Sequence, residues 1–219
     1  DVRQSQHFQA LFAAARKAGY LPEDVAAQHV GYGMVLGPDG RPFKTREGGT
    51  VSLMSLLDLA EQEAAPGIAL AAIKYADLSG AIHKDYVFDA ERMVQTTGDT
   101  GPYLQYAHAR TCQILRRAEA EGIGWGAVLV LTESDEQTLA LLLSRFGEVV
   151  DEAAQALTPH KLCGYLYDLA GALSAFYESC PVLKSEGEVR SSRLALVAAT
   201  RDVLAAGLSL LGIEAPERM

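Results

Sequence analysis

The chain has 219 residues, of which 49% are hydrophobic, 21% charged and 7% aromatic, and its formal net charge is -9. This composition is typical of a globular protein with a packed core, and it excludes a disordered chain. The negative charge also disfavours nucleic-acid binding over the whole surface, because phosphates are contacted by Lys and Arg, so any RNA contact must use a local basic cluster.

The sequence lacks signals for a membrane, for secretion and for a bound metal. No apolar run approaches the roughly 18 residues that span a bilayer, and residues 1–4 lack the basic start of a signal peptide. We therefore expect a cytoplasmic protein without a membrane partner, and the abrupt start suggests a fragment of a longer chain. The histidines are scattered and the cysteines lack metal-ligand spacing, so we predict no protein-bound metal and three free, buried thiols, Cys112, Cys163 and Cys180.

The first 90 residues mix strand and helix patterns. Residues 7–18 repeat apolar side chains at helical spacing, and Gly19 predicts the end of that helix. Residues 28–36 predict a strand whose glycines allow another backbone or a ligand to approach closely. A turn and a polar loop follow over 37–49. We then predict helices over 50–64 and 68–77, and a short strand or extended segment over 83–89.

From about residue 90 onward the apolar pattern is helical throughout. Pro102 suits the first turn of a helix, where its missing N–H has no partner to lose. We predict helices over 102–121, 134–157, 159–176 and 189–211, which would pack as an antiparallel bundle. The predicted fold class is thus α/β followed by all-α, with one domain over 1–89 and a second over 90–219.

Seven stretches, in order along the chain, carry a family resemblance. They are DVRQ with HF (1–8), GMVL (33–36), DGRPFKTR with GGT (39–50), AIKY with DLS (72–79), KDYVFD (84–89), TGPYLQYAHAR (100–110) and LLGIE with ERM (210–219). Together they resemble the arginyl-tRNA synthetases, a family of class I aminoacyl-tRNA synthetases. The resemblance covers essentially the whole chain, and its specificity lies in the ordered set rather than in any one stretch.

The resemblance implies a fold and an activity. The first domain would be the carboxy-terminal portion of a Rossmann-like class I catalytic domain, with a KMSKS-type loop and a connecting segment. The second would be a helical-bundle anticodon-binding domain. The full-length protein would be an arginine–tRNA ligase and a monomer, using ATP with Mg²⁺ and L-arginine to charge tRNA(Arg). The HIGH-type ATP sequence of such enzymes is absent from these residues, so we expect the isolated chain to be inactive.

The same resemblance assigns candidate residues for the chemistry. In the KMSKS-type loop, Lys44 and Arg46 would stabilise the charge that builds on the ATP phosphates, as mobile cations can. Gln4 would help to hold the substrate arginine through its amide. The ATP site would use His7, Gly33, Met34, Val35 and Lys44.

Aromatic and basic residues also gather on one predicted helix. Tyr103, Tyr106 and Arg110 follow at steps of three and four, so they share a face. Such a face can stack on unpaired anticodon bases and pair with phosphate. In the competing interpretation the tyrosines pack inside the bundle and Arg110 only extends its stem along it. Arg190, Arg193 and Arg201 are candidates for contacts to the tRNA backbone, and the alternative is that they are solvated surface residues.

Two other functions compete with the enzyme. One is a non-catalytic tRNA-binding module derived from a synthetase, which predicts loss of the cationic loop. The other is a helical interaction or assembly protein, which predicts a defined oligomer and no affinity for RNA. Lys44 and Arg46 weigh against the first alternative.

Overall fold

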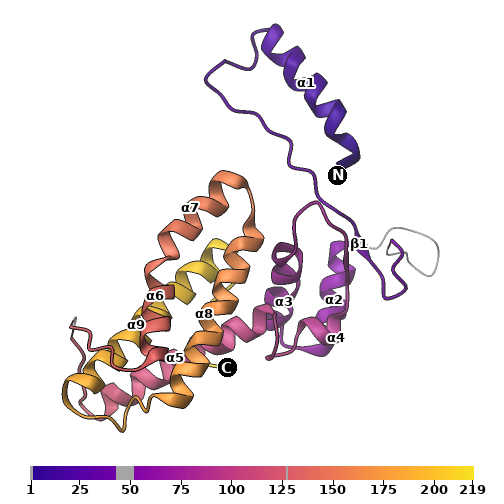
Figure 1. Ribbon diagram of the computed structural model, residues 1–219. Helices are drawn as coiled ribbons and strands as arrows, with labels where there is room; N and C mark the ends of the chain where they lie inside the picture. The colour runs from indigo at the N-terminus through magenta and orange to yellow at the C-terminus, as the bar shows by residue number, and fades with distance from the viewer. Residues whose placement is uncertain (1, 43–51, 127) are drawn as a thin grey trace. The chain divides into compact units, whose positions relative to one another are not determined.

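The computed structural model describes residues 2–42, 52–126 and 128–219 (Figure 1). These residues form two compact units. The first unit contains residues 2–42 and Gly80–Asp89, and the second, which we call the helical unit, contains Ser52–Ser79 and most of Ala90–Met219. The units divide the chain differently from the predicted boundary at residue 89, because Ser52–Ser79 packs with the later helices.

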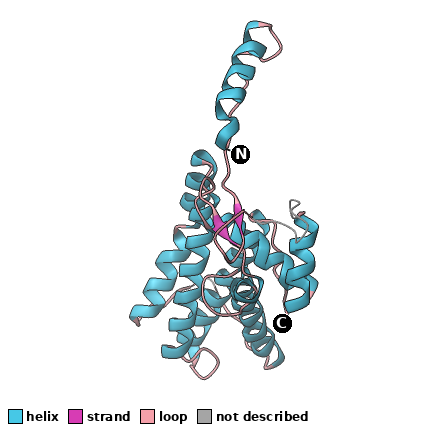
Figure 2. Ribbon diagram, turned by 90° about the vertical axis from the view of Figure 1, so that its right-hand side faces the viewer, coloured by secondary structure: helices cyan, strands magenta, loops and turns pink. Residues whose placement is uncertain are grey.

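The first unit contains one pair of short parallel strands. Its elements are η1 (Val2–Gln4), α1 (Ser5–Lys17), β1 (Val35–Leu36) and β2 (Tyr86–Val87), and Figure 2 shows the strands in magenta. The predicted strand over 28–36 was too long, because only its last residues join a ladder. Just before β1, the Gly33 amide donates to the Ile82 carbonyl (2.9 Å) and the Met34 amide to a side-chain oxygen of Asp85 (2.7 Å).

Gly33 lies where two backbone segments nearly touch. A Cβ atom built on it would stand 2.2 Å from the carbonyl oxygen of Lys84 and 2.7 Å from the amide nitrogen of Asp85. Only a residue without a side chain allows that approach. The prediction that these glycines admit a close neighbour is confirmed, and the neighbour is the backbone of this same chain.

The helical unit confirms the predicted helical pattern. α5 packs against α9, both α6 and α7 pack against α8, and α2 with α3 packs on the same group (Figure 1). Its helices are α2 (Leu53–Glu63), α3 (Pro66–Ser79), α4 (Ala90–Met93), α5 (Gly101–Ala120), α6 (Ser134–Ser144), α7 (Phe146–Ala156), α8 (Pro159–Ser179) and α9 (Gly187–Leu210).

Two helix starts follow directly from their sequences. The Ser52 hydroxyl accepts from the Ser55 amide (3.2 Å) at the start of α2, and the Thr100 hydroxyl accepts from the Tyr103 amide (3.2 Å) at the start of α5. Each bond satisfies an amide that has no partner within its helix. Pro102 occupies the first turn of α5, as predicted.

The predicted single helix over 134–157 is wrong, because the chain bends at Arg145 between α6 and α7. The cause lies on α8. The Tyr165 hydroxyl donates to the Leu142 carbonyl (2.9 Å), which also accepts from the Arg145 amide (3.1 Å). A side chain that takes a carbonyl out of the regular ladder bends a helix. Burial raises the pKa of Tyr165 to about 12, so the hydroxyl keeps the proton that it donates.

The core of the helical unit lies between α5, α8 and α9. Its fully buried side chains include Leu104, Leu166, Leu169, Phe176 and Leu204. The three cysteines are free and buried, which confirms the prediction. In the described part of the chain, no helix has the length and apolarity to cross a membrane, and no three His, Cys, Asp or Glu side chains gather to hold a metal.

Candidate nucleic-acid interface

A groove with a volume of about 930 Å³ lies within the helical unit. One wall is α5, the second is the segment 181–184 between α8 and α9, and residues 217–219 form the third side. Tyr177, near the end of α8, also lines it. The groove is therefore built from three parts of the chain that are far apart in sequence.

The α5 wall presents one face of that helix. Tyr106, Arg110, Gln113 and Arg117 follow at steps of four, three and four, which places them along a single stripe. Tyr106 is 46% exposed although it belongs to a helix with a largely buried opposite face. The α5 wall thus extends the predicted Tyr106–Arg110 face by two further turns.

Arg110 is held over an aromatic ring. Its guanidinium carbon lies 4.1 Å from the ring centre of Tyr177. A cation over the face of a tyrosine is attracted by the electrons of the ring. The contact joins α5 to α8 and holds the flat, positively charged guanidinium beside the ring of Tyr177. A ring and a cation placed together suit a nucleotide, whose base can stack while its phosphate pairs with the cation.

The groove is positively charged although the chain is acidic. Among the described residues that line it, Glu217 is the one acidic side chain, and its carboxylate lies 3.7 Å from Arg116. The basic side chains that line it are Arg110, Arg116, Arg117, Lys184 and Arg218. Composition required a local basic cluster for any RNA contact, and the tertiary structure assembles one here.

A second face of α5 holds the C-terminal segment in place. Three of its side chains donate to main-chain carbonyls of that segment: Gln105 Nε2 to Glu214 (2.9 Å), His108 Nδ1 to Pro216 (2.9 Å), and Arg116 to Glu217 (3.0 Å). A carbonyl can only accept, so His108 carries its proton on Nδ1. These bonds fix the backbone that leads to Arg218 at the edge of the groove.

The predicted tRNA-binding residues on α5 separate into two groups. Tyr106 and Arg110 line the groove. Tyr103 does not, because it packs against the core and its ring centre lies 5.7 Å from that of Tyr167. The interpretation in which a tyrosine packs inside the bundle therefore applies to Tyr103. Arg190 lies in the first turn of α9, partly exposed, and is not among the lining residues.

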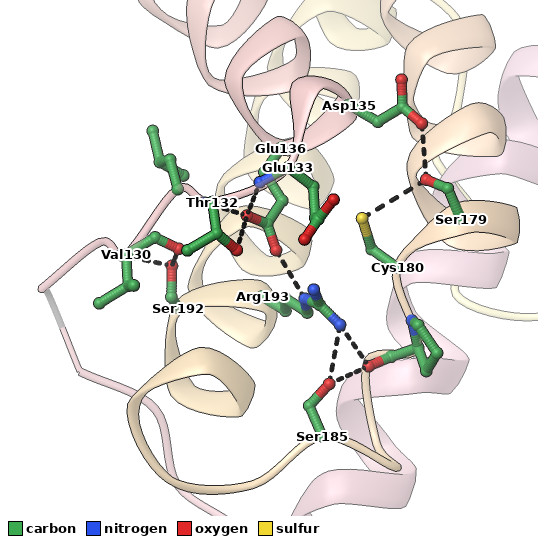
Figure 3. A network of polar contacts seen from close by, with 12 residues as sticks. Val130, Thr132, Glu133, Asp135, Glu136, Ser179, Cys180, Ser185, Ser192 and Arg193 are labelled. Carbon is green, nitrogen blue, oxygen red and sulfur yellow. Dashed lines mark hydrogen bonds and ion pairs between the residues drawn. The ribbon is translucent and has the colours of Figure 1, made fainter.

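Arg193 is not on the surface where an RNA contact would require it, so that expectation is wrong. The residue is only 7% exposed, and its Nε donates to Glu136 Oε1 at 2.6 Å. Figure 3 shows its guanidinium between the start of α6 and the segment that follows α8. Helical periodicity alone could not distinguish this buried position on α9 from the neighbouring exposed ones.

The predicted ATP and arginine residues belong to the first unit. Gln4 ends η1 and His7 lies in the first turn of α1, and both are exposed. Val35 pairs with Tyr86 in the parallel ladder, while the amides of Gly33 and Met34 bond within the unit as described above. Lys44 and Arg46 lie outside the described residues.

Five basic or aromatic residues that line the groove were not among the predicted site residues: Arg116, Arg117, Tyr177, Lys184 and Arg218. Arg117 carried a usable signal, because it continues the helical stripe of Tyr106 and Arg110 at the same spacing. Tyr177, Lys184 and Arg218 carried no such signal, because only the packing of α8 and the course of the segments 181–184 and 217–219 bring them to α5.

Family models match most of the chain. The DALR anticodon binding domain matches residues 104–219, which is more than half of it, and the catalytic domain of tRNA synthetases class I (R) matches residues 1–68. An arginine–tRNA ligase of Cutibacterium acnes is 71% identical, with 100% of this chain and 42% of that protein aligned. One of Frankia casuarinae is 48% identical, over 100% of this chain and 40% of that protein.

Solved structures show the same likeness. The arginyl-tRNA synthetase of Thermus thermophilus matches with a TM-score of 0.86 and 38% identity, over 100% of this chain and 40% of that one. The enzyme of Plasmodium falciparum matches with a TM-score of 0.81 and 27% identity, over 100% and 40%. The chain thus spans about two fifths of the length of the proteins that it matches.

Proposed function

Since the chain belongs to the DALR anticodon-binding domain family and corresponds to the carboxy-terminal portion of arginyl-tRNA synthetases, we propose that it serves an arginine–tRNA ligase. It would contribute the anticodon-binding region and the late part of the ATP site. The whole protein would activate L-arginine with ATP and transfer it to tRNA(Arg), working as a monomer in the cytoplasm. The basic, tyrosine-lined groove is the observation that carries the proposal.

In the proposed complex the groove receives the unpaired bases of the anticodon loop. Tyr106 and Tyr177 offer exposed rings on which bases can stack. Arg110 and Arg117 pair with phosphates, and Arg110 is already held above the ring of Tyr177. Stacking on aromatic rings contributes about 1–3 kcal/mol per base, which makes Tyr106 a main source of affinity.

In the same proposal the first unit takes part in arginine activation. Lys44 and Arg46 stabilise the phosphates of ATP, Gln4 helps to hold arginine, and His7 lies near the nucleotide. The backbone of Gly33, Met34 and Val35 lies along the adenine. Mg²⁺ accompanies ATP through its phosphates, and the proposal assigns it no protein ligand. The isolated chain should show no arginine-dependent exchange of pyrophosphate into ATP, and such exchange would overturn this division of the active site.

Removing two groove cations should weaken tRNA binding and its dependence on salt. We expect the intact chain to bind tRNA(Arg) in preference to a non-cognate tRNA. For the variant Arg110→Ala/Arg117→Ala, the magnitude of the slope of log K against log salt should decrease by about 1.4. The reason is that each phosphate contact on a single strand contributes about 0.7 to that magnitude. Filter binding or fluorescence anisotropy at four salt concentrations measures both quantities.

The matched control is Arg145→Ala, which removes an exposed arginine that does not line the groove. It should leave both the preference and the slope unchanged. If the double variant binds tRNA(Arg) as the intact chain does, the groove is not the binding site.

A further inference from the structure

The segment 181–184 forms one wall of the groove without being a helix or strand. Val182 is buried, Leu183 is half-buried, and Lys184 is exposed on the groove. An irregular segment of this kind needs contacts from its neighbours to hold one conformation. The position of the Lys184 ammonium group therefore depends on what fixes the two ends of the segment.

One guanidinium contacts both ends. Arg193 Nη1 donates to the Ser185 hydroxyl (2.8 Å; Figure 3) and to the Pro181 carbonyl (3.1 Å). Lys184 lies between these two bonded residues in the sequence. Ser185 in turn donates to the Pro181 carbonyl, which closes the segment into a loop. Arg193 itself comes from the second turn of α9, outside the loop that it holds.

A buried carboxylate fixes the other side of the guanidinium. Glu136 accepts from Arg193 Nε through Oε1, and through Oε2 from the amides of Thr132 (2.7 Å) and Glu133 (3.0 Å) at the start of α6. Glu136 is 0% exposed. Since the carboxylate is attached to the backbone of α6 on one side and to Arg193 on the other, the guanidinium has little freedom to move away from the loop.

We propose that Arg193 and Glu136 are positioning residues for tRNA binding: through Pro181 and Ser185 they fix the loop that places Lys184 against the RNA backbone. This inference rests on the proposed function. Arginine suits the role because its planar fork bonds the carboxylate and the loop at the same time. Lysine, as a single point charge, can keep the ion pair but cannot also keep both loop contacts.

A double-mutant cycle between Arg193 and Lys184 tests the proposal. The chain is prepared intact, as Arg193→Lys, as Lys184→Ala and with both changes, and binding to tRNA(Arg) is measured over a range of salt concentrations. Lys184→Ala alone should reduce the magnitude of the slope of log K against log salt by about 0.7, which corresponds to the loss of one phosphate contact. In the Arg193→Lys chain, Lys184→Ala should have almost no further effect, because that contact is already lost.

Two controls separate positioning from folding. Lys161→Ala removes a surface lysine that pairs with Glu152 outside the groove, and its effect should not depend on Arg193. Ser185→Ala removes the bonds of that hydroxyl to Arg193 and to Pro181, while the buried ion pair of Arg193 with Glu136 stays. Like Arg193→Lys, it should reduce the magnitude of the salt slope. Circular dichroism establishes whether each variant is folded at the temperature of the binding measurement. If Arg193→Lys is not folded, Ser185→Ala replaces it in the double-mutant cycle.

The outcomes distinguish this inference from the proposed function. If Arg193→Lys and Lys184→Ala change log K additively while Arg110→Ala/Arg117→Ala still weakens binding, the positioning role is wrong and the groove assignment stands. If none of these variants changes binding, the groove assignment fails and the positioning role fails with it.

Discussion

Replacing Arg193 by Met is expected to lower the free energy of unfolding of the helical unit by about 3–5 kcal/mol, the usual effect of removing one partner of a buried ion pair. Glu136 has no exposed surface, so after the change its charge stays buried without the guanidinium that balances it. The Ser185 hydroxyl also loses the guanidinium donor, and the Pro181 carbonyl keeps only the bond from Ser185. Urea unfolding followed by circular dichroism measures the loss.

Two further variants identify the cause. Glu136→Gln/Arg193→Met removes both charges but keeps an oxygen for the amides at the start of α6, so most of the stability should return. Arg201→Met breaks a partly exposed pair with Asp202 and should lower the free energy by at most about 1 kcal/mol. Equal losses for Arg193→Met and Arg201→Met would show that burial of the Glu136 pair has no energetic importance.

The same network should make the helical unit sensitive to acid. Burial by itself would raise the pKa of Glu136, but the Glu133 amide, the Arg193 guanidinium and the Thr132 amide outweigh it and hold the pKa below the ordinary 4.5. A lowered pKa in the folded state stabilises the fold above pH 4.5, and this stability is lost as the pH falls through the lowered value. The Glu136→Gln/Arg193→Met variant should therefore lose less stability than the intact chain between about pH 5 and pH 3. The difference should be on the order of the pH-dependent contribution that one carboxylate makes to the free energy of unfolding.

Gly101→Ala is expected to destabilise the helical unit by about 1–3 kcal/mol, the range for overpacking a tight contact. A Cβ atom on Gly101 would lie 2.4 Å from the carbonyl oxygen of Ala71 and 2.9 Å from the Cβ of Tyr75. These atoms belong to α3, and a backbone oxygen cannot turn away as a flexible side chain can. The start of α5 would have to separate from α3, and the midpoint of thermal unfolding would report it.

Gly164→Ala is the matched control for Gly101→Ala. Gly164 lies in the second turn of α8, and no atom stands within 4 Å of the Cβ position. The substitution should therefore stabilise the unit by roughly 0.5–1 kcal/mol, the difference between Ala and Gly in a helix. A destabilising effect of similar size at both positions would contradict the close contact between α3 and α5.

Much of the helical unit could be predicted from local patterns. The starts of α2 and α5 follow from Ser52, Thr100 and Pro102, because capping and a proline in the first turn act within a few residues of sequence. The break between α6 and α7 could not, because its cause is the hydroxyl of Tyr165, 23 residues away on another helix. Long-range hydrogen bonds leave no periodic signal.

The candidate site divides in the same way. The sequence by itself determined the stripe of α5 that carries Tyr106 and Arg110, because residues three and four apart on a helix must share a face. Only the tertiary structure decided that Tyr177, Lys184 and Arg218 join this stripe, that Tyr103 packs inward, and that Arg193 is buried against Glu136. The physical reason is that helical spacing fixes directions around one axis, whereas burial and charge pairing depend on which other segments pack there.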